Sequence, residues 1–213
     1  MNKAIFLDRD GVVNKPCYHD ELGIYSPRTV DELIIFPYAK EACRQLKKLG
    51  YQLIVVSNQP GVAFGTIREE DLAEITARIQ SEIPEIDAFY YCRHHPAHTG
   101  ECDCRKPKDG LFRQAAEKRG VNLSASIMIG DNLSDILAAK GCACTILLAD
   151  TRIDLLSIME AKKVFPDYIA KDLSHAASIV QDINQNNNEE HTSRCDRCWR
   201  LGHPHAADVR KNS

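Results

Sequence analysis

The stretch that decides the fold is Ile5-Phe6-Leu7-Asp8-Arg9-Asp10-Gly11-Val12-Val13-Asn14. Its first three apolar residues predict a buried strand, and two carboxylates, Asp8 and Asp10, follow that strand one residue apart. Gly11 then allows the backbone to turn sharply beside a ligand. In open α/β sheets ligands bind beyond the carboxyl ends of the strands, so this strand end is a candidate site. The alternative is an ordinary buried strand that ends in an acidic turn.

The rest of the chain alternates between strand and helix patterns. After the first strand at 4–7, apolar runs predict strands at 52–56, 88–91, 126–129, 145–148 and 168–170. Amphipathic patterns between them predict helices at 38–49, 69–82, 110–119, 133–140, 152–161 and 173–183, and three of these are followed directly by glycine. This order predicts an α/β fold, a doubly wound parallel sheet with helices on both faces.

The composition is that of one globular domain with a short appendage. Of the 213 residues 44% are hydrophobic and 27% are charged, which suffices for a sizeable core. We expect a domain at 1–184 and a flexible polar tail at 185–213. The net charge of −3 argues against binding to nucleic acid or to anionic membranes. Because the chain shows neither a signal-peptide pattern nor an apolar run of about 20 residues, we expect a cytoplasmic protein, and we expect it to be a monomer.

Two long segments interrupt the alternation. Residues 15–36 form an insertion after the first strand and carry Tyr18, His19, Tyr25 and Arg28. Loops of this length inside a domain are often lids or binding loops. Residues 93–109 form the second segment, which is rich in His, Cys, Pro and charge.

The later strand ends also carry groups that suit phosphate chemistry. Ser57-Asn58-Gln59 offers a hydroxyl and amides, Arg105-Lys106 offers two cations, and Gly130-Asp131-Asn132 offers a further carboxylate, with Asp135 one helical turn on. Each piece also has a plain structural interpretation, as a helix-capping turn or as solvated charge. Their joint appearance on successive strand-helix units favours one shared site.

At these residues the chain resembles the haloacid dehalogenase-like phosphatases, whose four motifs match Asp8-Arg9-Asp10-Gly11, Ser57-Asn58, Lys106, and Gly130-Asp131 with Asp135, over roughly residues 1–183. The resemblance implies a Rossmann-like fold and a Mg²⁺-dependent phosphatase. Asp8 would then be the nucleophile that forms an aspartyl-phosphate, and Asp10 would protonate the leaving group and later activate water. Mg²⁺ would be held by Asp8, the Asp10 carbonyl and Asp131, and Asp135 would orient the metal shell. Ser57 and Lys106 would stabilise the charge on the phosphoryl oxygens.

Nine cysteines are many for a chain without an export signal, and several are clustered. Cys92, His94, Cys102 and Cys104 have the C-x-H-x₇-C-x-C spacing of a closed structural zinc site. The alternative is a loop without metal, and His95 and His98 are competing ligands. Such a zinc ion would fix a loop that has little apolar core of its own, with the domain capped only by small loops.

This zinc loop, followed by Arg105-Lys106-Pro107, is similar to that of the heptose-bisphosphate phosphatase branch, which removes the 7-phosphate of D-glycero-D-manno-heptose 1,7-bisphosphate. The resemblance implies a small sugar phosphate as substrate. We expect the substrate-binding residues to be Arg9, Asn58, Gln59, Arg105 and Asn132, with a further contact from the loop at 16–19. Histidinol-phosphate phosphatases share the loop, so histidinol phosphate or another small phosphomonoester is the alternative substrate. A non-catalytic, zinc-dependent interaction protein is an alternative from another class, against which the intact motif set argues.

The tail contains Cys195, Cys198, His203 and His205. A second zinc site is one interpretation, and a flexible polar extension is the other. We favour the extension because a lone C-x-x-C pair is weak support for a metal site.

Overall fold

The computed structural model describes residues 2–149 and 155–189. Its centre is a six-stranded sheet in the order β5-β4-β1-β6-β7-β8, and every neighbouring pair of strands in it is parallel. The strands are β1 (Ala4–Leu7), β4 (Gln52–Asn58), β5 (Ile86–Cys92), β6 (Ile127–Gly130), β7 (Cys144–Leu148) and β8 (Tyr168–Ala170). The predicted doubly wound parallel sheet is confirmed.

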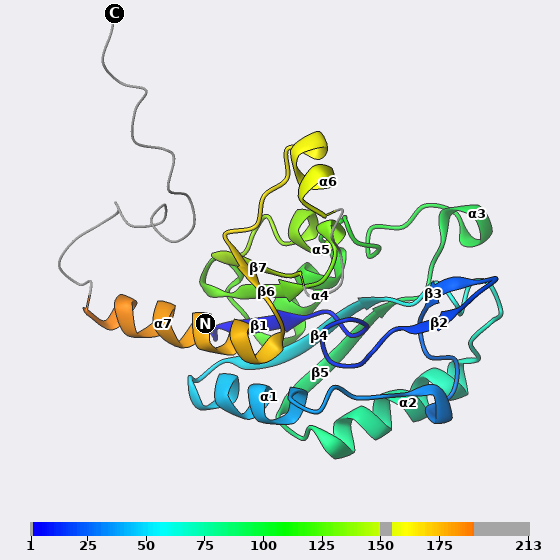
Figure 1. The fold of residues 1–213 in the computed structure, drawn as a ribbon, viewed down its shortest axis with the longest axis horizontal. Coiled ribbons are helices and arrows are strands. Elements are labelled where there is room, and N and C mark those ends of the chain that lie inside the picture. Colours follow the sequence, from blue (N-terminus) through cyan, green and yellow to red (C-terminus); the bar gives the residue numbers. More distant parts are fainter. Residues whose placement is uncertain (1, 150–154, 190–213) are drawn as a thin grey trace, which may run out of the picture.

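Helices cover both faces of this sheet (Figure 1). The helices are α1 (Ala39–Lys48), α2 (Glu69–Glu82), α4 (Gly110–Arg119), α5 (Leu133–Ala138), α6 (Leu155–Lys162) and α7 (Leu173–Glu189), with a short α3 (Pro96–Thr99) and 3₁₀ turns η1 (Val30–Glu32) and η2 (Leu123–Ala125). Successive strand residues point to opposite faces. Ile5 and Leu7 therefore pack with α1, α2 and α7, whereas Ala4 and Phe6 pack with α4 and α5.

The insertion at 15–36 contains a small antiparallel hairpin, β2 (Cys17–His19) and β3 (Gly23–Tyr25). Two backbone hydrogen bonds hold the ends of the insertion together: the Lys15 N–H donates to the Ile34 carbonyl, and the Phe36 N–H donates to the Val13 carbonyl. Figure 1 shows the hairpin and α3 at the end of the sheet toward which β1 runs. We call β2 and β3 together the cap hairpin.

The last helix is longer than predicted. The sequence pattern ended it at Ile183, whereas α7 continues to Glu189, into the polar segment that we expected to be flexible. Apolar residues near its start, such as Ala176 and Val180, are buried in the core, and a helix fixed there extends more easily than a new one begins. The predicted boundary between domain and tail at residue 184 stays a prediction. The tail residues 195–205 and the predicted helix start at 152 lie outside the described residues. None of the described helices is long and apolar enough to span a bilayer.

Candidate active site

The carboxyl ends of β1, β4 and β6 meet at one pocket. Asp8 follows β1, Ser57 lies at the end of β4, and Asp131 follows β6. The pocket measures about 440 Å³. Its wall consists of Asp8, Asp10, Pro16, Cys17, Tyr18, Ile24, Tyr25, Ser26, Ser57, Asn58, Lys106, Asp131, Asn132 and Ser134. Strands β4 and β5 lie on one side of β1, and β6, β7 and β8 lie on the other, so the strand order changes direction between β1 and β6. Doubly wound folds bind their ligands at this point.

Lys106 is a buried cation that links two carboxylates. Its Nζ lies 3.0 Å from Asp8 and 2.6 Å from Asp135, and it donates to the Val56 carbonyl at 2.8 Å. Burial alone would lower the pKa of Lys106, but the charges of Asp135 and Asp8 outweigh burial and raise that pKa. Lys106 is therefore held as a cation at the edge of the pocket.

Asn58 fixes the backbone of Lys106. Its Nδ2 donates to the Lys106 carbonyl, and its Oδ1 accepts from the Lys106 N–H, both at 3.0 Å. Asn58 also lines the pocket. Its contacts in this structure place Lys106, and its expected contact with substrate stays a prediction.

Asp10 accepts five hydrogen bonds from four residues, namely two from Arg9 at 3.1 Å and one each from Asn14 at 2.8 Å, Ser26 at 2.7 Å and Gln59 at 2.9 Å. Burial would raise the pKa of Asp10, yet the Arg9 charge and these hydrogen bonds lower it. In the free protein Asp10 is thus held as a carboxylate, the state that a general base requires.

The predictions that Arg9 and Gln59 contact substrate do not fit their positions. Both side chains have no exposed surface, and neither is part of the pocket wall. Arg9 donates at 2.9 Å to Gln59 and lies over the Tyr91 ring. A buried guanidinium needs a counter-charge and acceptors, and Asp10 and Gln59 supply them beneath the pocket.

Asp8, Asp131 and Asp135 form a cluster in which one oxygen from each lies within 4.8 Å of the others. Asp131 packs so closely on the loop after β1 that a Cβ at Gly11 would come within 2.3 Å of its carboxylate. Oxygen ligands from Asp8 and Asp131 at the pocket wall fit Mg²⁺, which binds through one or two carboxylates and keeps several waters.

Asp135 is the buried member of this cluster, and its expected role of orienting the metal shell stays a prediction. It is fully buried, pairs with Lys106, and accepts from the Asn132 N–H at 3.0 Å as part of the capping box of α5. Burial, together with the nearby negative charge of Asp8, raises the pKa of Asp135 to about 6, although the charge of Lys106 acts in the opposite direction. Its direct role here is to hold Lys106 and the start of α5.

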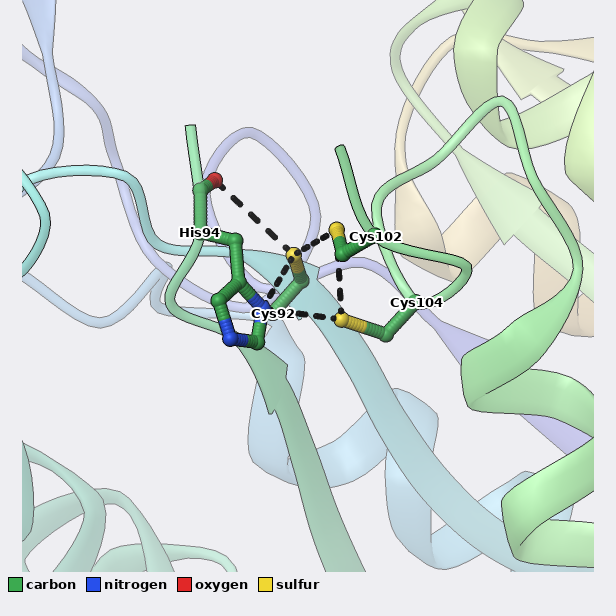
Figure 2. Close-up of side chains that lie close together, drawn as sticks. All are labelled: Cys92, His94, Cys102 and Cys104. Carbon is green, nitrogen blue, oxygen red and sulfur yellow. Dashed lines mark hydrogen bonds between the residues drawn. The ribbon is translucent and has the colours of Figure 1, made fainter. Parts of the chain in front are cut away.

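The second cluster is the predicted zinc site, at the end of β5 (Figure 2). Cys102 Sγ lies 3.7 Å from Cys92 Sγ and 3.6 Å from Cys104 Sγ, and His94 Nδ1 lies 3.8 Å from Cys92 Sγ and 3.2 Å from Cys104 Sγ. Tetrahedral zinc with bonds of about 2.3 Å to sulfur requires S···S edges of about 3.8 Å, so these four atoms fit one Zn²⁺. The S···S separations are far longer than the roughly 2.05 Å of a disulfide.

The competing ligands do not join this cluster. The His95 ring packs at 4.6 Å on Phe64 and its Nδ1 accepts from the Ala97 N–H, while the His98 ring lies 4.7 Å from Phe64. Arg105 donates to the His94 carbonyl at 3.3 Å and is not part of the pocket wall, so the structure attaches it to the zinc loop. Asn132 lines the pocket, and its Oδ1 accepts from the Ser134 N–H; its expected contact with substrate stays a prediction.

Sequence reasoning missed Ser26, Ile24 and Ser134 as parts of the pocket wall. A hairpin signal was available, because the turn-forming residues Asp20 and Gly23 lie between two short runs with aromatic or β-branched residues. That signal predicts a hairpin but does not show which of its residues meets Asp10.

Comparison with known proteins identifies relatives over most of the chain. Residues 13–142 match the family described as haloacid dehalogenase-like hydrolase. The D-glycero-beta-D-manno-heptose-1,7-bisphosphate 7-phosphatase of Haemophilus influenzae is 39% identical over 150 residues, which are 66% of this chain and 77% of the relative. The enzyme of the same name from Pasteurella multocida is 32% identical over 193 residues, 86% of this chain and 99% of the relative.

Solved structures agree with these relatives. The D,D-heptose 1,7-bisphosphate phosphatase of B. bronchiseptica, solved with magnesium and phosphate, is 28% identical and superposes with a TM-score of 0.71. The match covers 85% of this chain and 99% of that one.

Proposed function

This chain belongs to the haloacid dehalogenase-like hydrolases, and we propose that it is a Mg²⁺-dependent phosphatase that removes the 7-phosphate of D-glycero-D-manno-heptose 1,7-bisphosphate. One observation carries the proposal: Asp8 and Asp10 from the loop after β1, Lys106 from the loop before α4, and Asp131 from the end of β6 line one pocket. The substrate is that of the relatives, whose name specifies the beta anomer.

Asp8 is the nucleophile of the proposed reaction. The Arg9 N–H, at 2.7 Å, and Lys106, at 3.0 Å, both bind its Oδ1, which fixes the rotation of the carboxylate. Its Oδ2 attacks phosphorus, the bond from phosphorus to the sugar oxygen breaks, and the phosphoryl group passes to Asp8. A bound Mg²⁺ supplies positive charge that offsets the repulsion between the carboxylate and the phosphate.

Asp10 transfers the protons in both halves of the proposed reaction. It takes up a proton from solvent when the anionic substrate binds and gives it to the departing sugar alkoxide. The resulting carboxylate then removes a proton from the water that attacks the aspartyl-phosphate; the bond from phosphorus to the Asp8 oxygen breaks, inorganic phosphate leaves, and the proton on Asp10 returns to solvent. Its lowered pKa suits the second half, in which it acts as a base.

Lys106 and Ser57 stabilise the charge that develops on the phosphoryl oxygens. Lys106 is already fixed by Asp135, the Val56 carbonyl and Asn58, so it need not reorganise when the reaction occurs. Donors that are oriented in advance in this way are among the largest contributors to catalysis.

The proposed Zn²⁺ is structural, since three thiolates and one imidazole fill its coordination shell and leave no position for substrate. Burial, followed by the neighbouring thiols, raises the pKa of Cys104 to about 12, so a cation is needed to hold the Cys104 sulfur as a thiolate. The zinc loop continues into Arg105-Lys106, so we infer that it also sets the approach of Lys106 to the pocket. We further propose that residues 1–184 act as one monomeric unit, since every residue assigned to the two sites lies between 8 and 135.

The test is a phosphate-release assay with Mg²⁺ on both anomers of heptose 1,7-bisphosphate, histidinol phosphate and simple sugar phosphates. We expect the highest kcat/KM for heptose 1,7-bisphosphate. Asp8→Asn should abolish turnover while its circular dichroism spectrum and zinc content remain those of the wild type. A clear preference for histidinol phosphate would transfer the proposal to that substrate, and no hydrolysis of any phosphomonoester would favour a non-catalytic role.

A further inference from the structure

The cap hairpin delivers one hydroxyl to the proposed proton carrier. Ser26 directly follows β3, lines the pocket, and donates from Oγ to Asp10 Oδ2 at 2.7 Å. Ser26 belongs to none of the four phosphatase motifs. It is separated from Asp10 by 16 positions and reaches it only because the insertion folds back over the site.

The other donors to Asp10 belong to the body of the domain. Arg9 and Asn14 come from the turn after β1, and Gln59 comes from the end of β4. All three are fully buried and their positions are set by the core. Among the described donors, Ser26 alone depends on where the cap hairpin lies.

The cap hairpin is also the part of the pocket wall suited to contact the sugar. Tyr18 and Ile24 face each other across its strands, line the pocket, and remain 69% and 66% exposed. Two strands of three residues each are marginally stable on their own, so contacts with a bound molecule should affect where the hairpin lies. Substrate contact and the hydrogen bond to Asp10 are therefore properties of the same small unit.

We propose that Ser26 is a positioning residue, which couples the placement of the cap hairpin over the sugar to the orientation of Asp10 for proton transfer. This inference rests on the proposed phosphatase function. It predicts that loss of the Ser26 hydroxyl impairs the step in which the leaving group takes a proton, more than the steps that bind the phosphate.

The experiment compares two leaving groups in the full-length protein. The sugar of heptose 1,7-bisphosphate leaves as an alkoxide and needs a proton, whereas the phenolate of p-nitrophenyl phosphate leaves without one. The ratio kcat/KM covers the steps up to departure of the leaving group, and hydrolysis of the aspartyl-phosphate, common to both substrates, does not enter it. General acid catalysis contributes roughly 10²–10⁴-fold, and Ser26 is one of several donors to Asp10. We therefore expect Ser26→Ala to lower kcat/KM for the sugar phosphate about tenfold. The same variant should lower kcat/KM for p-nitrophenyl phosphate by less than about threefold.

Three controls separate positioning from a general effect on folding. Ser26→Thr keeps a hydroxyl and should restore most of the loss. Asp20→Ala alters the turn of the same hairpin at an exposed residue outside the pocket wall, and should change kcat/KM for both substrates by the same factor. In an Asp10→Asn background, Ser26→Ala should add less than about a twofold loss, since the group that it positions is already absent.

Equal losses on both substrates, or a full additional loss in the Asp10→Asn background, would overturn the inference and leave the phosphatase assignment intact. If the wild type hydrolyses another alkyl phosphate but not heptose 1,7-bisphosphate, the proposed substrate is wrong. The role of Ser26 is then decided by comparing kcat/KM for that alkyl phosphate with kcat/KM for p-nitrophenyl phosphate. A wild type that hydrolyses no phosphomonoester would refute both.

Discussion

Gly11→Ala should separate the two carboxylates of the proposed Mg²⁺ site. Gly11 has a φ of +88°, and a Cβ there would lie 2.3 Å from Asp131 Oδ2 and 2.6 Å from its Cγ. Ordinary contact begins at 3.4 Å, so the Asp131 carboxylate must retreat by about 1.1 Å. The loop after β1 carries Asp8 and Asp10 as well and cannot yield freely.

The expected cost has two parts that different assays measure. A left-handed backbone costs a residue other than glycine roughly 1–2 kcal/mol, which urea denaturation would report as a lower free energy of unfolding. A displacement of about 1 Å at a reacting centre can cost about 100-fold in rate, and we expect a loss of that size in kcat/KM. Calorimetric titration of the free protein with Mg²⁺ should show weakened binding, independently of turnover.

Gly120→Ala is the matched control. Gly120 ends α4 with a φ of +62°, but an added Cβ there meets nothing within 4 Å. This variant should lose similar stability and keep its Mg²⁺ affinity and activity. Normal Mg²⁺ binding by Gly11→Ala, or an equal loss of activity in Gly120→Ala, would refute the reasoning from the Asp131 contact.

Three further predictions concern the zinc site and the buried lysine. Cys102→Ser should remove the zinc found by elemental analysis, whereas Cys142→Ser, outside the cluster, should retain it; retention in both would exclude Cys102 as a ligand. Lys106→Met should lower kcat by roughly 10²–10³-fold. It should also lower the free energy of unfolding by about 3 kcal/mol, because it leaves Asp135 buried without its cation. The control Lys108→Met, at an exposed ion pair, should lower that free energy by less than about 1 kcal/mol. The stability deficit of Lys106→Met should also shrink as the pH falls from 7 to 5. The pKa of Asp135 is about 6 in the folded wild type, above its ordinary value of 3.8, and it rises further in the variant that lacks the cation. As the pH falls from 7 to 5, the folded variant therefore gains more stability from protonation of Asp135 than the folded wild type does. A deficit that stays constant with pH would show that Asp135 is not its source.

The strands and most helices could be predicted because their signals are local. Buried parallel strands such as β1 and β6 are continuous apolar runs, and α4 ends at a glycine. The predicted bounds therefore differ by only a few residues from those observed. The bounds of α7 were predicted less well, because its last turns follow from the packing of its first ones and carry no apolar pattern of their own.

The zinc cluster was also predictable, since its ligands come as two closely spaced pairs on one loop. The roles of Gln59 and Asn58 were not. Both were identified as polar groups at a strand end, but their partners, Asp10 and the Lys106 backbone, lie 49 and 48 positions away. Which amide faces a ligand and which holds another residue depends on those distant partners.

The sequence by itself thus determined the sheet, the strand ends that meet at the pocket and the four clustered residues of the proposed zinc site, because hydrophobic periodicity and short ligand spacings are properties of neighbouring residues. Only the tertiary structure decided that Asp135 pairs with Lys106, that Arg9 and Gln59 lie beneath the pocket, and that Ser26 reaches Asp10. These contacts satisfy buried charges, and a buried charge pairs with whichever group the packing of distant segments brings within hydrogen-bond distance.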